Sequence, residues 1–101
     1  MRLCNVVGMV VSTVKDPGLQ GIKLLVVEDC DTRARGKGVY HVAADAVGAG
    51  VGEVVLTAAG SSARQTRVTA DRPVDSVIMA IVEIIEADGA ITYRKTEAVA
   101  P

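Results

Sequence analysis

The stretch Ala43–Arg64, AADAVGAGVGEVVLTAAGSSAR, decides how the rest of the chain is interpreted. Glycine stands at every second position between 48 and 52, and Gly60 follows a short apolar run. Such density indicates forced chain geometry, because glycine adopts positive φ and allows another backbone to come close. The run Glu53–Ala59 predicts a buried strand. Gly60 predicts a break, followed by an N-cap serine and a short helix over Ser61–Thr66.

The other predicted strands are rich in Val and Ile, which fit the pleated surface of a sheet. They are predicted at Met1–Val14, Ile22–Asp29, Val39–Asp45, Val77–Glu86 and Ala90–Lys95. The fourth is long enough for a helix, but six of its ten residues are Val or Ile, which favours a strand. The second has an unbroken apolar centre, which predicts burial on both faces.

Glycine also marks the predicted irregularities of these strands. Gly8 predicts a bulge or bend inside the first strand. Asp16-Pro17-Gly18 predicts a turn in which the glycine takes positive φ, and Asp88-Gly89 predicts a two-residue hairpin.

Composition predicts an all-β fold for this chain. Val and Ile number 18 and 6, against 5 Leu, with no Phe or Trp. We predict a small closed Greek-key barrel of the oligonucleotide/oligosaccharide-binding (OB) type, with five to six strands and one short helix. An up-and-down barrel is the alternative. Residues 1–95 form the single domain and residues 96–101 a flexible tail. Val and the 14 Ala make a thin core, which favours oligomerisation.

Charge and cysteine usage exclude several classes of protein. A formal net charge of −1 lacks the electrostatic footprint of a non-specific nucleic-acid binder. Cys4 and Cys30 have no metal-type spacing, and we interpret both as reduced thiols, with a disulfide as the alternative. No apolar run is long enough for a membrane helix and no targeting segment is recognised. The sequence therefore predicts a soluble, cytoplasmic protein.

The glycines at 48–52 do not match a nucleotide-binding motif. The dinucleotide fingerprint needs G-x-G-x-x-G before a helix, whereas here Glu53 takes the last glycine position and a strand follows. A structural turn is the preferred interpretation. The run Ser61-Ser62-Ala63-Arg64 could bind an anion at a helix start, but a capped helix with a surface or interface arginine is preferred.

No residue pattern predicts catalysis, a cofactor or a metal site. His41 is the only histidine and has no sequence-level link to Ser61 or Ser62, so triad chemistry is disfavoured. One histidine without a cluster of other ligands makes no metal site. Two tyrosines and no basic excess also disfavour binding of single-stranded nucleic acid.

Three blocks carry a resemblance to a known family. They are Gly8–Leu25 (GMVVSTVKDPGLQGIKLL), Val42–Gln65 (VAADAVGAGVGEVVLTAAGSSARQ) and Pro73–Glu83 (PVDSVIMAIVE). The chain resembles the vertex proteins of bacterial microcompartment shells, which include the ethanolamine-utilisation and carboxysome vertex proteins. Many relatives carry Trp at or next to the position of Val54, and the tail beyond Lys95 also differs.

The resemblance implies an OB-type barrel that assembles as a homopentamer. Such pentamers close the five-fold vertices of an icosahedral shell whose facets are hexameric proteins. It implies a structural protein of the cytoplasmic shell, with no enzyme activity, no cofactor, no nucleic acid and no membrane partner. An OB-type module that binds a small ligand or single-stranded nucleic acid is the alternative.

A five-fold ring needs heterologous contacts, in which one patch meets a different patch on the neighbouring copy. Small residues suit a place where five chains meet. The residues expected at the subunit interface or five-fold axis are Gly48, Ala49, Gly50, Val51, Gly52, Glu53, Ser61, Ser62 and Arg64.

Overall fold

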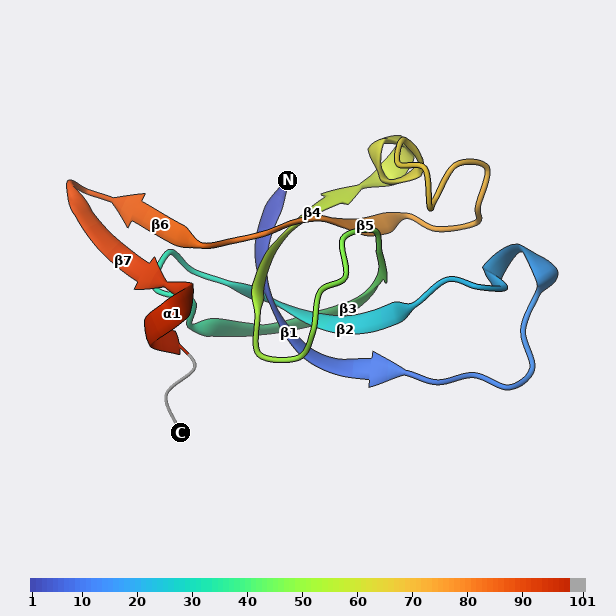
Figure 1. Ribbon diagram of the computed structural model, residues 1–101, viewed down its shortest axis with the longest axis horizontal. Helices are drawn as coiled ribbons and strands as arrows, with labels where there is room; N and C mark the ends of the chain where they lie inside the picture. Colours follow the sequence, from blue (N-terminus) through green and yellow to red (C-terminus); the bar gives the residue numbers. More distant parts are fainter. Residues whose placement is uncertain (99–101) are drawn as a thin grey trace.

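The computed structural model describes residues 1–98, and the structural statements below concern that part of the chain (Figure 1). Seven strands are formed: β1 Arg2–Val10, β2 Leu24–Cys30, β3 Gly36–Asp45, β4 Val54–Ala59, β5 Ser76–Ile81, β6 Ile84–Ala87 and β7 Ala90–Arg94. The helical segments are short: η1 Pro17–Leu19, η2 Gly60–Arg64 and α1 Lys95–Ala98.

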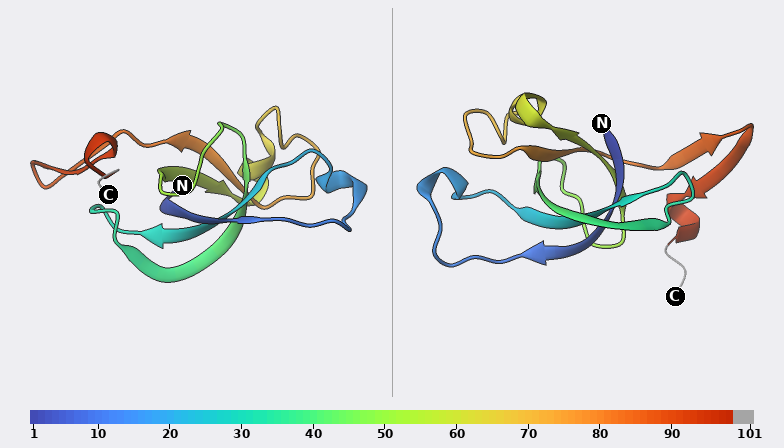
Figure 2. Two further views of the ribbon diagram at one scale, coloured as in Figure 1. Left: turned by 60° about the horizontal axis from the view of Figure 1, so that its bottom comes forward. Right: turned by 180° about the vertical axis from the view of Figure 1, so that it is seen from behind.

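The first five strands close a barrel in the order β1-β2-β3-β5-β4, with β1 paired to β4. Only the contact between β3 and β5 is parallel, and it spans two residue pairs. This arrangement confirms the predicted closed all-β Greek-key barrel. Strands β6 and β7 form a separate hairpin that projects from one end of the molecule, whereas the β1–β2 connection extends from the other (Figures 1 and 2).

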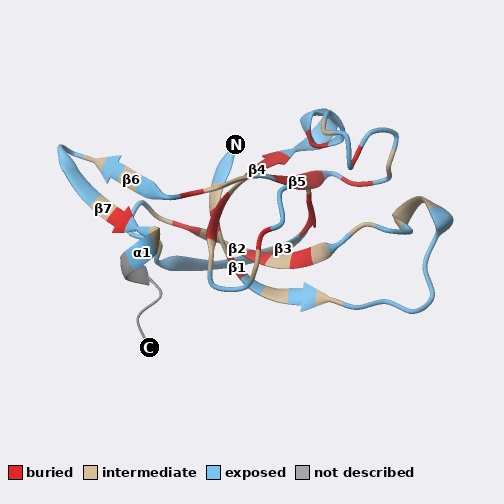
Figure 3. Cartoon of the chain, in the orientation of Figure 1, coloured by how far each residue is buried: buried red, intermediate tan, exposed pale blue. Residues whose placement is uncertain are grey.

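Inward and outward positions alternate along every strand, and mostly small side chains occupy the inward ones. The barrel core contains Cys4, Val6, Leu25, Val27, Ala43, Ala49, Val55 and Ile78. A second cluster lies under η2, where Ala63 packs with Ala58 and Val77. A third cluster joins the hairpin to the barrel, and in it Val54 packs with Val82 and Tyr93. Figure 3 shows the buried residues concentrated on the barrel strands.

The apolar run Val77–Glu86 was predicted as one strand, and the structure divides it into β5 and β6. The break falls at Val82, whose N–H donates to the Val54 carbonyl at 2.8 Å and whose side chain is buried. The chain therefore leaves the barrel at this point and starts a second sheet. Composition could not reveal the break, because both halves are equally apolar.

The first two strands differ from prediction in their limits and burial. Strand β1 ends at Val10 instead of Val14, and the predicted bulge at Gly8 is confirmed by a register shift between Val6 and Gly8. In β2, Leu25 is buried but its neighbours in the sequence are only partly so. The expected burial of both faces is therefore not reached within one chain.

Both predicted turns form, with one correction. Asp16 caps η1 by accepting a hydrogen bond from the Gly18 N–H at 2.7 Å, but Gly18 does not take positive φ. The left-handed residue is Gly21, with φ of 76°. In the β6–β7 hairpin, Asp88 and Gly89 have φ of 54° and 77°, as the two-residue turn requires.

The predicted helix after Gly60 is also corrected. Segment η2 is a 3₁₀ helix that begins at Gly60, and its N-cap is Ala59, with no side-chain capping bond, instead of a serine. Gly60 has φ of 64°, a left-handed value that glycine tolerates, which allows the turn out of β4. At the C-terminus, α1 occupies the start of the predicted tail; residues 99–101 of that tail lie outside the described residues.

Candidate functional site

The glycine loop, residues 47–53, is shaped by carboxylates at its two ends. Asp45 lies at the end of β3, and its Oδ1 accepts hydrogen bonds from the N–H groups of Val47, Gly48 and Ala49, each at 3.1 Å. Lys23 supports this turn, because its Nζ lies 3.7 Å from Asp45 Oδ2 and donates to the Ala49 carbonyl at 2.8 Å. The first half of the loop is thus wound around one buried carboxylate.

Glu53 organises the second half of the loop. Its Oε1 accepts from the Gly50 N–H at 2.6 Å, and its Oε2 lies 2.9 Å from Lys95 Nζ at the start of α1. The hydrogen bond from Lys95, followed by that from Gly50, holds the pKa of Glu53 below its ordinary value. The same contact raises the pKa of Lys95. Glu53 therefore ties the loop to the C-terminal end of the hairpin.

The three positions of the loop that hold glycine differ in whether the backbone requires that residue. Gly48 and Gly52 have φ of 80° and 94°, a region that disfavours any side chain. Gly50 has no such φ, and a Cβ added there would be in ordinary contact, 3.7 Å from a Glu53 oxygen. No contact within one chain therefore requires a glycine at position 50. A contact with another copy of the chain would explain why glycine stands there.

The loop lies against β1 at the surface of the barrel. Gly52 N–H donates to the Val6 carbonyl and Val6 N–H donates to the Glu53 carbonyl, both at 2.9 Å. Val47 and Val51 are exposed, whereas Ala49 is buried in the barrel core and offers almost no surface to a neighbour. Ala49 thus belongs to the barrel core, although it lies in the middle of the residues predicted for the subunit interface.

The two parts of the predicted set do not come together in the chain. The glycine loop precedes β4 and η2 follows it, so a strand of six residues, about 20 Å long, separates them. Ser61, Ser62 and Arg64 are exposed, and Arg64 donates to the Val74 carbonyl at 3.5 Å.

Sequence reasoning missed a polar cluster around the only histidine. His41 Nε2 lies 3.1 Å from Ser76 Oγ, and His41 Nδ1 lies 3.9 Å from Asp29 Oδ1. The second separation exceeds hydrogen-bond distance, and Asp29 is already engaged by Arg2 at 3.2 Å and by the Cys4 thiol at 3.4 Å. The cluster therefore lacks the geometry of a nucleophilic triad.

The cysteines are also unsuited to nucleophilic chemistry. Both are free and buried in the structure, as expected of reduced thiols. Burial raises the pKa of Cys4 to about 11 and raises that of Cys30, so both stay protonated at neutral pH. Among the described residues, no group of three or more His, Cys, Asp or Glu side chains could hold a metal ion.

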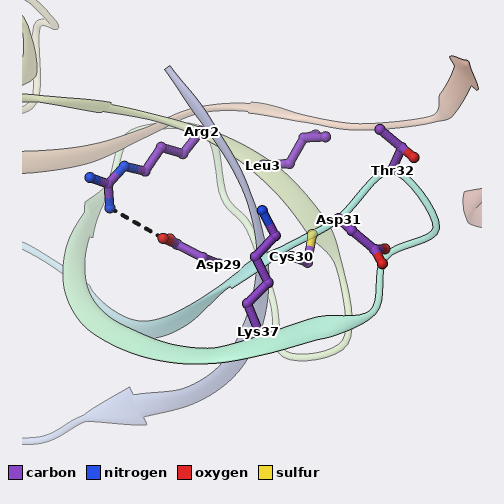
Figure 4. Close-up of a pocket in the computed structure, with 7 residues that line it drawn as sticks. All are labelled: Arg2, Leu3, Asp29, Cys30, Asp31, Thr32 and Lys37. Carbon is purple, nitrogen blue, oxygen red and sulfur yellow. Dashed lines mark hydrogen bonds and ion pairs between the residues drawn. The ribbon is translucent and has the colours of Figure 1, made fainter.

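Cys30 lines a shallow hollow of about 460 Å³ near the start of β1 (Figure 4). Side chains of both charges line it, namely Arg2, Lys37, Asp29 and Asp31, and Arg2 pairs with Asp29 on one side (Figure 4). Asp31 is turned toward its own loop, where the Arg35 and Arg33 N–H groups lower its pKa. The hollow thus offers no concentrated charge for a ligand.

Comparison with known proteins identifies the family. The family model described as "Ethanolamine utilisation protein EutN/carboxysome" matches residues 1–83, which include the whole barrel. The chain belongs to the EutN/CcmL family. Its relatives include the carboxysome shell vertex protein CcmL of Synechococcus elongatus, 46% identical over 97 residues, with 96% of this chain and 98% of that protein covered.

Solved structures of the EutN/CcmL family share the fold. CcmL of Gloeobacter violaceus superposes with a TM-score of 0.89 at 40% identity, covering 95% of this chain and 99% of that one. The pentameric microcompartment shell protein GrpN of Rhodospirillum rubrum gives 0.79 at 41% identity, covering 86% and 99%. Among the described residues of this family member, none of the helices is long and apolar enough to cross a membrane.

Proposed function

We propose that this chain is a structural shell protein whose homopentamers close the five-fold vertices of a bacterial microcompartment. Membership of the EutN/CcmL family carries the proposal, because relatives that align with nearly the whole chain are named shell vertex proteins. One similar solved structure is also named as a pentameric shell protein. In the cell, the pentamer would sit in the shell in the cytoplasm and contact hexameric shell proteins. It would need no cofactor and perform no catalysis.

The surface of the chain supports assembly. The accessible area is 6126 Å², whereas a compact monomer of 10.5 kDa exposes about 5,400 Å². Large apolar side chains are exposed on β1, β3, the glycine loop and the hairpin. A subunit that buries these surfaces against its neighbours accounts for both features.

Native mass spectrometry tests the proposal directly. The expected species has five times the 10.5 kDa chain mass. Co-expression with a hexameric shell protein should give closed particles in electron micrographs only when this chain is present. A monomer across micromolar concentrations would reject the proposal.

The alternative, binding of single-stranded nucleic acid, has little support in the structure. Tyr40 is exposed but Tyr93 is buried, so one aromatic ring is available where stacking platforms use several. Filter binding at low salt distinguishes the two functions, since tight and salt-sensitive binding is expected only of the alternative.

The glycine loop remains our candidate for one of the subunit contacts, and Gly50→Leu is the sharpest probe. A Cβ added there meets only ordinary contact within the chain, so the variant should fold but lose pentamer in native spectra. Ala70→Leu, at an exposed position of the connector after η2, is the matched control and should remain pentameric. An intact Gly50→Leu pentamer would remove the loop from the interface.

A further inference from the structure

One stretch of β3, paired with β2 on one side, has no strand partner on its β5 side among the described residues. The Asp45 N–H donates to the Lys23 carbonyl on the β2 side at 2.9 Å. Backbone groups alternate along a strand, so those of Tyr40 and Val42 point the other way, toward β5. Strand β5 pairs only with Ala44 and Asp45. No described residue therefore pairs with the backbone of Tyr40 and Val42, which we call the β3 edge (residues 40–42).

Two hollows lie beside the β3 edge at Val42. One of about 360 Å³ is lined by Arg2, His41, Val42, Thr57, Ala59, Asp75 and Ser76. A smaller one of about 180 Å³ is lined by polar and apolar groups in similar measure and shares Val42, Asp75 and Ser76 with the first. Tyr40 and Val42 are 59% and 45% exposed. An apolar strand edge with space beside it is a template for an added strand.

A second unpaired edge lies on β1, next to the glycine loop. Val6 faces the β4 side, because its carbonyl accepts from the Gly52 N–H. The bulge at Val7 adds one residue, so the backbone of Met9 faces that side, and continued alternation past the end of β1 at Val10 places that of Val11 there too. Strand β4 pairs with β1 only from Arg2 to Asn5. Met9 and Val11 are 58% and 81% exposed, and we call residues 9–11 the β1 edge.

We propose that the β1 edge of one copy pairs with the β3 edge of the next copy around the ring. The inference rests on the proposed pentamer and adds the contact that builds it. Each edge presents two N–H and two C=O groups with the two-residue spacing of a strand, and both carry apolar side chains. The two edges are different patches of one chain, as the heterologous contacts of a closed ring require. The glycine loop, bonded to β1 at Val6, then lies beside the contact.

Hydrogen exchange on the unmodified assembly tests the backbone pairing. In the pentamer, the amides of Met9, Val11, Tyr40 and Val42 should exchange at least tenfold more slowly than unpaired backbone predicts. Fast exchange at all four in an intact pentamer would reject the inference and leave the proposed function standing. Slow exchange at 40–42 with fast exchange at 9–11 would also reject it, since another segment, such as the hairpin, would be the added strand.

Two variants provide an independent test. Met9→Pro removes an N–H that faces away from β2, so the chain should keep its fold and lose the intersubunit bond. Val42→Lys places a charge on the β3 edge, and Val68→Lys is its control at a similarly exposed valine. We expect folded monomers by circular dichroism and native mass for the first two and a pentamer for the control. Pentameric Met9→Pro and Val42→Lys would overturn the pairing, whereas a monomeric parent protein would overturn the proposed function instead.

Discussion

Single residues fix the shape of the glycine loop, and Asp45 does so most directly. One carboxylate oxygen accepts three consecutive backbone N–H groups, which is the local chemistry that makes Asp a turn residue. The sequence offers this signal as Asp before a glycine-rich run, yet it does not show how many amides the side chain reaches. The three hydrogen bonds form only if residues 47–49 fold back toward Asp45 at the end of β3.

Asp45→Ala should lower the free energy of unfolding by about 2–3 kcal/mol, because three buried or half-buried amides lose their acceptor. Asp45→Asn keeps one acceptor oxygen and should lose less. Urea unfolding followed by circular dichroism measures both. Glu86→Ala, an exposed change on the hairpin, should stay within about 0.5 kcal/mol. Equal stability of Asp45→Ala and the parent protein would show that the loop does not depend on this carboxylate.

The contacts of the Glu53 carboxylate should make a contribution to stability that depends on pH. Its folded-state pKa lies below the unfolded value, since Lys95 and the Gly50 N–H favour the carboxylate. The stabilisation is therefore complete above the ordinary Glu pKa of about 4.3 and is lost as the pH falls through the lower folded value. The parent protein should lose its advantage over Glu53→Gln as acid is added. A constant difference between pH 7 and pH 3 would contradict the assignment.

At the scale of elements, the β6–β7 hairpin stands apart from the barrel. A two-stranded hairpin is marginally stable alone, so it depends on the cluster in which Tyr93 packs with Cys30, Val54 and Val82. Thr92 Oγ1 also donates to the Thr32 carbonyl in the β2–β3 connection. The hairpin is thus anchored by one buried face, while Ile84 and Ile91 remain exposed.

Tyr93 anchors this element through its ring and not through its hydroxyl. Within the described part of the chain, the buried Tyr93 Oη makes no hydrogen bond of ordinary geometry, and the backbone of Val54 is a weak contact that only partly offsets the rise in the pKa of Tyr93 caused by burial. Tyr93→Phe should therefore leave the unfolding free energy unchanged or raise it by up to about 1 kcal/mol. Tyr93→Ala should cost about 3 kcal/mol, because a buried ring is lost. Thermal unfolding compares the two, and a large loss with Phe would reveal a partner for the hydroxyl.

At the scale of the whole molecule, stability and assembly should be linked. A subunit that buries apolar edges against its neighbours is stabilised by mass action, so the midpoint of thermal unfolding should rise with protein concentration. Circular dichroism suits the measurement, since the chain has no Trp. Met9→Pro, if monomeric, should show no such rise. A midpoint independent of concentration in the parent protein would argue against linked unfolding.

The sequence by itself determined the fold class, the strands from β1 to β4, the hairpin turn at Asp88-Gly89 and the family. Local preference and apolar patterning carry the fold class and the strands, because Val and Ile favour strands wherever they occur, whereas the family was indicated by the resemblance of three sequence blocks. Patterning could not show that Val77–Glu86 crosses from one sheet to another, that Ala59 caps η2, or that His41 meets Ser76. Those facts depend on contacts between residues far apart in the chain, and only the closed barrel brings such residues together. The unpaired edges at residues 9–11 and 40–42 also depend on the tertiary structure. A backbone group is left without a partner only once the register of its neighbours is fixed, and the tertiary structure alone decides that register.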